Sequence, residues 1–251
     1  MSRVANSHRL RIGVITSGVS GISLAAALRA CQHTIMGVSF LDTPMCVGGV
    51  REGAETCADS EALTMADRLD AMLPNASLKE PTQLIEESDV VLLCVSAAWE
   101  LRDFLEHSEE KSLWRRGQLV IHTAPDAGAS LCDTAADRGA FVIAMHPAIE
   151  FTGTSLDIER LHGAYWALDA APLVLPIGEA IVMDLGGEAR IVEDSVRGDY
   201  TKAIRAATTT THTLAREIRT LLRNAHIDDD SYAWNLMEHS LREGLRGSEE
   251  L

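Results

Sequence analysis

Over the first three quarters of the chain, short apolar runs alternate with stretches of helical composition, and this alternation limits the possible folds more than any other feature. The apolar runs occupy residues 10–15, 35–40, 90–95, 119–122, 141–145, 164–168 and 189–192. They are apolar on both faces, as expected of strands buried inside a parallel sheet. Helices are predicted between them, over residues 21–31, 60–73, 82–87, 100–105, 128–138 and 173–185. The pattern predicts an α/β fold with a doubly wound, mostly parallel sheet.

The pattern changes near residue 194, after which no strand-like run occurs. A long helix is predicted over residues 199–224 and a second one over residues 230–246, which follows the acidic run at 228–230. We therefore predict two domains, an α/β domain over residues 1–194 and a small all-α domain over residues 195–251. The helical domain is expected to contribute to the substrate cleft and to dimerisation.

The long helix carries two stripes at helical spacing. One is mostly apolar and consists of Ile204, Ala207, Thr208, Thr211, Ala215, Ile218 and Leu222. The other is mostly basic and consists of Lys202, Arg205, Thr209, His212, Arg216, Arg219 and Arg223. The basic stripe could line an anionic site or form a solvated face paired with acidic neighbours. We favour the solvated face, because charge stripes usually have that role.

The first apolar run is followed directly by a short polar loop and a helix. The loop reads Thr16-Ser17-Gly18-Val19-Ser20-Gly21, and we assign all six residues to a nucleotide site. Strand, glycine-containing turn and helix in this order form the dinucleotide-binding arrangement of a Rossmann-type domain. Gly18 would let the backbone approach a pyrophosphate, and Gly21 would let the helix pack close to the strand. The alternative is a tight turn that binds nothing.

The end of the second apolar run bears on the choice between NAD and NADP. Ser39 lies near this end, and we assign it to the cofactor site. Asp42 lies a little later than the acid that would bind the ribose hydroxyls of NAD, and no basic residue that would favour NADP occurs before Arg51. The sequence predicts NADP or NAD as the cofactor and leaves the choice open.

Two later runs end in histidine, the first at His122-Thr123 and the second at His146-Pro147. Consecutive strands of a parallel sheet end at the same edge, where α/β folds bind their ligands. The two histidines could there orient a nicotinamide, hold a substrate carbonyl or carry a proton. A metal site is disfavoured, because no third ligand lies at suitable spacing. The remaining alternative is that both histidines are hydrogen-bonded to loop backbone.

The bulk composition argues against several other classes of protein. With 22 basic and 37 acidic residues, the chain carries a formal net charge of −15 at pH 7, so nucleic acid is a poor partner. No apolar run approaches the roughly 20 residues of a membrane helix, and the polar start lacks the apolar segment of a secretory signal. The five cysteines form no Cys-x-x-Cys pair, which disfavours disulfides and zinc ribbons. We expect a cytoplasmic protein that takes a small-molecule substrate.

Four segments of the chain, in this order, resemble a known family. They are the glycine loop, the aspartate-led run at 89–95, the segment at 117–123 and the segment at 146–151, which reads His-Pro-Ala-Ile-Glu-Phe. Together they look like the oxidoreductases that pair a Rossmann-like domain with a helical C-terminal domain of unknown function. These belong to the phosphogluconate dehydrogenase-like superfamily, some of whose members resemble ketopantoate reductases. The resemblance covers roughly residues 10–225.

The chain departs from the family pattern at several positions in the loops. Thr16 stands where the family has the first of three glycines, and Ser96 stands where it has a proline after valine. Ala124 and Pro125 replace the Ser-Gly of the family's His-Thr-Ser-Gly segment.

Further departures fall on the long helix. Members of the family tend to carry Tyr-His there and an asparagine eight residues after that histidine. The matching positions are Tyr200-Thr201 and Thr209, so the proton-donating histidine and the orienting amide that the resemblance implies are both absent. Related reductases of the superfamily use a lysine on the equivalent helix, which makes Lys202 a candidate substitute.

These observations predict an NAD(P)-dependent reductase of a small, anionic keto acid. The predicted site residues besides the glycine loop and Ser39 are Ser96, His122 and Thr123 for the nicotinamide, and His146, Lys202 and Tyr200 for the substrate. The alternative is a catalytically inactive, nucleotide-binding regulator, because the departures on the helix fall where the chemistry should be. A structural protein that binds no nucleotide would require the glycine loop to be without function.

The predicted helical domain also indicates an oligomer. Two helices with one-sided apolar faces bury little surface alone, and Tyr232, Leu236, Met237 and Leu241 add further apolar area. We therefore expect a homodimer built through these helices.

Overall fold

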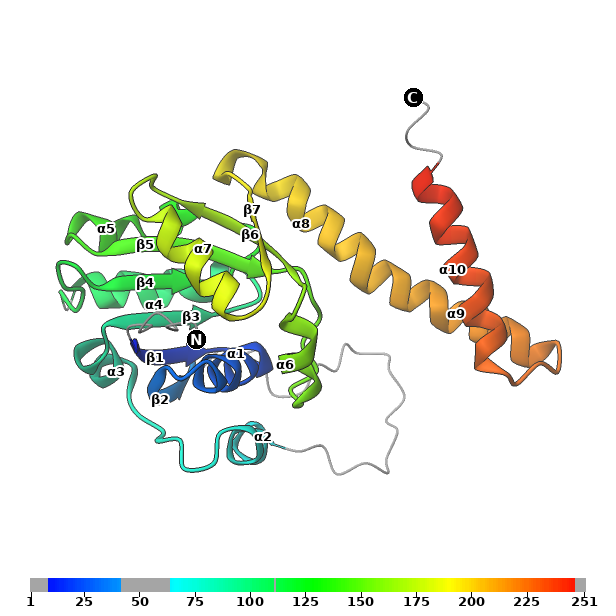
Figure 1. The fold of residues 1–251 in the computed structure, drawn as a ribbon, viewed down its shortest axis with the longest axis horizontal. Coiled ribbons are helices and arrows are strands. Elements are labelled where there is room, and N and C mark those ends of the chain that lie inside the picture. The colour runs from blue at the N-terminus through cyan, green and yellow to red at the C-terminus, as the bar shows by residue number, and fades with distance from the viewer. Residues whose placement is uncertain (1–8, 42–63, 111, 247–251) are drawn as a thin grey trace, which may run out of the picture. The chain divides into compact units, whose positions relative to one another are not determined.

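The computed structural model describes residues 9–41, 64–110 and 112–246 of the chain (Figure 1). The chain divides into two compact units, Met1–Tyr200 and Thr201–Leu251. The division falls within helix α8 (Arg197–Arg205), a few residues after the predicted boundary at 194. The roles predicted for the two domains remain predictions.

A seven-stranded sheet forms the centre of the first unit (Figure 1). Its strands are β1 (Arg11–Thr16), β2 (Thr34–Phe40), β3 (Val90–Cys94), β4 (Leu119–His122), β5 (Phe141–Pro147), β6 (Tyr165–Ala170) and β7 (Glu188–Ile191). They lie in the order β2-β1-β3-β4-β5-β6-β7, and all neighbours are parallel except β5 and β6. Each strand predicted from the sequence is present, so the predicted doubly wound, mostly parallel sheet is confirmed.

The central strands are buried on both faces, which explains their continuous apolar runs. In β3, Val90 and Leu92 pack into one hydrophobic core, whereas Val91 and Leu93 pack into a second core on the opposite face. Burial of a Val or Leu side chain contributes roughly 1.5–3 kcal/mol. A strand with alternating polar residues could not gain this stabilisation on both sides, so the sequence pattern fits only an interior strand.

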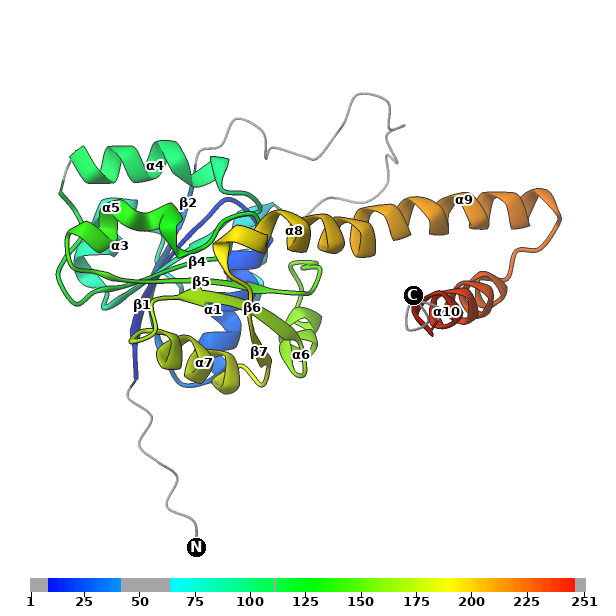
Figure 2. The same cartoon turned by 90° about the horizontal axis from the view of Figure 1, so that it is seen from above.

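Helices cover both faces of the sheet (Figure 2). On one face lie α1 (Val19–Ala30), α6 (Leu156–Leu161) and α7 (Leu175–Asp184), and α2 (Met65–Met72) packs against α1. On the other face lie α3 (Pro81–Glu87), α4 (Trp99–Glu110), and the 3-10 helix η1 (Ala129–Cys132) continued by α5 (Asp133–Asp137). Of the helix predicted over residues 60–73, residues 60–63 lie outside the described residues. Helix α6 was not predicted.

Chain order reverses at β1, which lies between β2 and β3. The loops that follow β1 and β3 therefore emerge side by side at the carboxyl edge of the sheet. Doubly wound α/β folds bind their ligands at this point of reversal. The fold thus places the glycine loop where a ligand site is expected.

The second unit contains the remainder of α8, the π-helical segment η3 (Ala206–Thr210), α9 (Thr211–Asn224) and α10 (Asp230–Arg246). The predicted long helix is therefore interrupted by a π-helical segment. The predicted apolar stripe is half-buried at every position except Ala207, which is exposed. On the basic stripe, Arg219 pairs with Asp230 and Arg223 with Asp228, as expected of a solvated face. None of the helices within the described residues is long and apolar enough to cross a membrane.

Candidate functional site

The loop between β1 and α1 is closed by the side chain of Thr16, the residue in place of the family's first glycine. Thr16 is fully buried, and its hydroxyl accepts a hydrogen bond from the Gly18 N–H (3.1 Å) and donates one to the Gly18 carbonyl (2.8 Å). The Ser17 N–H donates to the Cys94 carbonyl at 3.0 Å, which joins the loop to the end of β3. Thr16 therefore stabilises a compact turn before the helix.

Gly18 and Gly21 have different surroundings. Gly18 precedes α1 with an extended φ of −159°, and a Cβ there would meet no atom within 4 Å. A side chain at Gly18 would project into open space beside a helix N-terminus, where anions bind readily. A Cβ at Gly21 would lie 2.5 Å from Thr16 Oγ1 and 2.9 Å from Thr16 Cγ2. Gly21 therefore allows the close packing of helix and strand that the sequence predicts.

A buried carboxylate that the sequence analysis did not single out connects two loops at this edge. Glu100 lies in the first turn of α4 and is only 8% exposed. It accepts hydrogen bonds from the Ser17 hydroxyl and from the Ser96 N–H, the latter at 3.2 Å. Two predicted cofactor contacts, Ser17 and Ser96, are thus brought together through a third residue.

The end of β4 is occupied by internal hydrogen bonds. His122 is fully buried, and its Nε2 donates to the Gly128 carbonyl at 2.8 Å. Burial lowers the pKa of His122 to about 4, so the ring is neutral at pH 7. Thr123 Oγ1 accepts from the Val95 N–H (3.0 Å) and donates to the Val95 carbonyl (3.1 Å). Both side chains fix the loops around them, and their predicted contact with a nicotinamide remains a prediction.

The end of β5 brings two predicted substrate residues together. His146 Nδ1 and the Tyr200 hydroxyl are hydrogen-bonded at 2.8 Å, and the rings meet edge to face with centroids 5.6 Å apart. Burial, together with the positive charge of Arg197, lowers the pKa of His146 to about 4. Burial raises the pKa of Tyr200 to about 12, although Arg197 opposes the shift. At neutral pH this pair therefore consists of a neutral imidazole and a protonated phenol.

Arg197 is the charged residue behind this pair. Its side chain is 1% exposed and donates to the carbonyls of Val192 (3.0 Å), Ala144 (3.4 Å) and Ala167 (3.3 Å). Its guanidinium carbon lies 5.9 Å from the centre of the Tyr200 ring. Arg197 thus binds backbone carbonyls of both β5 and β6, and its positive charge adds to the effect of burial on His146 and opposes it on Tyr200.

Two aspartates hold the loop after β4 close to Arg197. The Gly128 N–H donates to Asp194 (2.6 Å) and the Ala129 N–H donates to Asp169 (2.8 Å). Both carboxylates lie close enough to Arg197 to counteract the lowering of its pKa by burial. The ends of β4 and β5 therefore have two carboxylates, Asp169 and Asp194, as well as the guanidinium of Arg197 close by.

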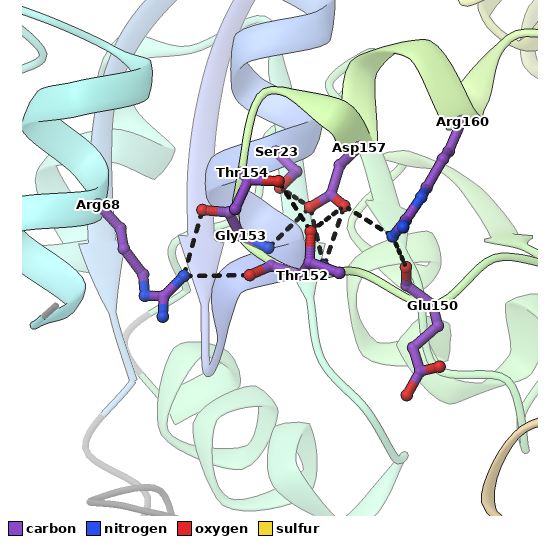
Figure 3. Close-up of polar contacts among 8 residues, drawn as sticks. All are labelled: Ser23, Arg68, Glu150, Thr152, Gly153, Thr154, Asp157 and Arg160. Atoms are coloured by element: carbon purple, nitrogen blue, oxygen red, sulfur yellow. Dashed lines mark hydrogen bonds and ion pairs between the residues drawn. The ribbon is translucent and has the colours of Figure 1, made fainter. Parts of the chain in front are cut away.

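A second buried carboxylate, Asp157, fixes the loop that follows β5 (Figure 3). Asp157 accepts hydrogen bonds from the N–H groups of Thr152 (3.0 Å) and Gly153 (2.8 Å), and from the hydroxyls of Thr152 (2.8 Å) and Ser23 (2.7 Å). Ser23 belongs to α1. Asp157 therefore fastens the loop to the helix that begins at the glycine loop.

The same loop reaches the first turn of α1. A Cβ at Gly153 would lie 2.9 Å from Val19 Cβ and 2.9 Å from Arg68 Nη1. Arg68, from α2, donates to the carbonyls of Thr152 (3.0 Å) and Gly153 (3.3 Å) (Figure 3). The segment after His146 is thus packed against the start of α1, with an arginine beside it.

The remaining predicted residues stay predictions. Ser39 is buried in β2, and Val19 and Ser20 form the first turn of α1. Lys202 belongs to the second unit. Asp42 lies outside the described residues. Within the described ranges, no group of three or more His, Cys, Asp or Glu side chains gathers in a way that could hold a metal ion.

Comparison with known proteins agrees with this architecture. Residues 50–147 match the family model of the Rossmann-like domain. No curated protein matches the chain in sequence. The fold and the arrangement of strand, glycine loop and helix thus define a Rossmann-like α/β protein with a helical C-terminal part.

Several solved structures with this fold are oxidoreductases by name. An imine reductase from Pseudomonas sp. aligns over 97% of this chain and 77% of its own, with a TM-score of 0.68 and 16% identity. A protein assigned as an NADP oxidoreductase, from Bacteroides fragilis, aligns over 94% and 80%, with a TM-score of 0.64 and 14% identity. A variant imine reductase from Myxococcus stipitatus, in complex with NAD+, aligns over 96% and 75%, with a TM-score of 0.60 and 16% identity. At these identities the likeness shows the fold.

Proposed function

We propose that the chain is an NAD(P)-dependent oxidoreductase that binds the dinucleotide at the loop between β1 and α1. The observation that carries this proposal is the open space at Gly18, which lies directly before a helix N-terminus at the point where chain order reverses. The names of the structural neighbours, an NADP oxidoreductase and an imine reductase solved with NAD+, support it.

The residues around the loop fit such a cofactor. The backbone of residues 16–21 would hold the pyrophosphate, Ser39 would lie toward the adenosine ribose, and Ser96 would border the nicotinamide. The chemistry that a bound nicotinamide supplies is hydride transfer.

Tyr200 is the proton donor that the geometry supports best. Its raised pKa keeps the phenol protonated at neutral pH, and its hydrogen bond to His146 fixes the direction of the hydroxyl. His146, with a pKa of about 4, cannot supply a proton as an imidazolium at pH 7. Its neutral ring can instead orient the Tyr200 hydroxyl, while Arg197 stabilises the phenolate that forms on proton transfer and a proton from solvent restores the phenol.

A small keto acid is the substrate class that we propose first, with Lys202 as the partner for its carboxylate. A protonated imine is a second candidate. The carboxylates of Asp169 and Asp194 close to Arg197 would favour a cation, and four of the neighbours are imine reductases by name. Proton donation by Tyr200 suits the reduction of a C=O group, whereas an iminium carries its proton already.

The proposal is tested by oxidation of NADPH and NADH in the presence of a panel of keto acids and cyclic imines. We expect Tyr200→Phe to lower turnover of a keto acid at least about a hundredfold and to leave nucleotide affinity nearly unchanged. Lys202→Ala should raise the KM of a keto acid and not that of an imine. The control is Tyr165→Phe, since Tyr165 is an exposed tyrosine of β6.

Two results would overturn parts of the proposal. Nucleotide binding without turnover of any compound would favour the inactive, nucleotide-binding regulator, whose loop Thr16 closes by hydrogen bonds to Gly18. Absence of any response to millimolar NADPH or NADH would show that the loop is a tight turn without a ligand.

We also propose that the protein acts in the cytoplasm as a homodimer joined through α9 and α10. No described residue of either helix is buried, although both helices are amphipathic. Exposed apolar side chains on them include Leu214, Leu221, Leu236 and Leu241. A second copy of the chain would cover this surface.

A further inference from the structure

The first turn of α4 places a buried carboxylate between two loops of the first unit. Glu100 Oε2 accepts a hydrogen bond from the Ser17 hydroxyl, and Glu100 Oε1 accepts one from the Ser96 N–H at 3.2 Å. Ser17 and Glu100 are 83 residues apart in the sequence, so their contact joins distant parts of the chain. A carboxylate that is only 8% exposed is costly to bury unless its oxygens are hydrogen-bonded, and these two contacts provide that compensation.

The position of this contact in the sheet relates it to the proposed nucleotide site. Thr16 of β1 pairs with Cys94 of β3, and Ser17 and Ser96 follow these strand ends. Chain order reverses between these strands, so ligands are expected at their carboxyl ends. Glu100 therefore connects the two loops between which the proposed function places the dinucleotide.

Other contacts hold the start of α4 independently of Glu100. The Ala98 N–H donates to Asp126 Oδ1 at 2.8 Å, and the Val95 N–H donates to Thr123 Oγ1 at 3.0 Å. The helix would keep its place if the Glu100 side chain were shortened. What Glu100 adds is the orientation of the Ser17 hydroxyl and of the Ser96 backbone.

We propose that Glu100 is a positioning residue for the dinucleotide and that it acts by hydrogen bonding rather than by charge. It holds Ser17 on the pyrophosphate side and Ser96 on the nicotinamide side in the geometry that receives the cofactor. A negative charge beside a phosphate is repulsive, so the charge of Glu100 weakens binding while its hydrogen bonds strengthen it. This inference rests on the proposed function.

The test compares the affinity of the full-length wild type and five variants for NADPH or NADH, whichever binds the wild type more tightly, by calorimetry. Glu100→Ala removes both contacts and should weaken binding about tenfold, or about 1.4 kcal/mol. Glu100→Gln keeps an oxygen for the Ser96 N–H and an amide group for Ser17 without the charge, so it should bind at least as tightly as the wild type. The control is Glu106→Ala, because Glu106 is an exposed residue of the same helix.

Ser17 supplies the second arm of the test. If Ser17 acts through Glu100, Ser17→Ala should weaken nucleotide binding by less than the tenfold expected for Glu100→Ala. The double variant Ser17→Ala/Glu100→Ala should then bind no more weakly than Glu100→Ala alone. Circular dichroism and melting temperatures establish that each variant is folded.

The outcomes separate this inference from the proposed function. A wild type that binds neither nucleotide would overturn both. A wild type that binds, with Glu100→Ala equal to it, would overturn the positioning role and leave the proposed function standing. Glu100→Gln as weak as Glu100→Ala, or additive losses in the double variant, would also overturn this inference, because the charge of Glu100 or a direct contact of Ser17 would then account for the affinity.

Discussion

At the scale of single residues, Gly21 is a position where the fold leaves no room for a side chain. A Cβ there would lie 2.5 Å from Thr16 Oγ1, and both residues are buried. We expect Gly21→Ala to destabilise the protein by about 1–3 kcal/mol, because α1 must move away from β1. The measurement is the free energy of unfolding in urea.

The matched control for Gly21 is Gly198→Ala in α8, where a Cβ would meet no atom within 4 Å. Alanine favours a helix over glycine by up to about 1 kcal/mol, so this variant should be at least as stable as the wild type. Equal stability of Gly21→Ala and the wild type would show that helix and strand are not packed as described.

The protonation state of His146 gives a second prediction at this scale. Burial and Arg197 lower its pKa to about 4, against about 6.5 in an unfolded chain. His146 should therefore remain neutral between pH 5 and pH 8, and the stability that its neutral form contributes should be lost as the pH falls from about 6.5 toward 4. NMR titration of the histidine rings measures this pKa directly. A value above 6 for His146 would contradict the electrostatics described for the site.

The sequence indicates which residues end strands, but it does not indicate which side chains meet. His146 and Tyr200 could be assigned to one site because a strand end and a family position both pointed there. Glu100 and Asp157 could not, since each acts through a partner far away in the chain, 83 residues in one case and 134 in the other. The role of Arg197 could not be predicted from the sequence either. Its hydrogen-bond acceptors are backbone carbonyls of two strands and of the segment after β7, and any residue type supplies a backbone carbonyl.

At the scale of elements, the strands were predictable and some helical details were not. Strand β3 is apolar at every position because both faces are buried, a pattern that needs no knowledge of its neighbours. Helix α6 has only six residues and depends on Asp157 contacts for its place. The π-helical segment η3 contains three consecutive threonines, Thr208, Thr209 and Thr210, whose effect on helix geometry the apolar spacing does not report.

At the same scale, we predict that the stability of the protein in acid depends on the Asp157 carboxylate, which fixes the loop between β5 and α6. Burial alone would raise the pKa of Asp157, but hydrogen bonds from Thr152, Ser23 and Gly153 outweigh burial and hold the pKa below its usual value. The stability that Asp157 contributes is therefore present above about pH 4 and is lost as the pH falls through its lowered pKa.

Asp157→Asn should lower the free energy of unfolding at pH 7 by about 2–3 kcal/mol, since several hydrogen bonds to a charged group are lost. It should also make stability less dependent on pH below 4. The control is Asp137→Asn at an exposed position of α5, which should behave as the wild type. An Asp157→Asn variant with an unchanged acid transition would contradict the assigned role of this carboxylate.

At the scale of the whole molecule, the second unit leads us to expect a homodimer. Leu221 of α9 is 60% exposed, and a charge at this position should disrupt an apolar interface. We expect a dimer mass by light scattering at tens of micromolar and a shift toward the monomer for Leu221→Glu. Met183→Glu, at an exposed apolar position of α7, is the control and should remain a dimer. A monomeric wild type would refute the prediction.

Binding of a nicotinamide dinucleotide by the first unit at Gly18 is tested most directly by calorimetric titration of the wild type and of Gly18→Val. A side chain at Gly18 meets open space and the backbone there is extended, so the variant should fold with nearly the melting temperature of the wild type. Its side chain would occupy the place of the phosphate, so we predict at least a tenfold weaker affinity for NADPH or NADH, about 1.4 kcal/mol. A folded Gly18→Val variant that binds as tightly as the wild type, or a wild type that does not respond to millimolar nucleotide, would contradict the claim.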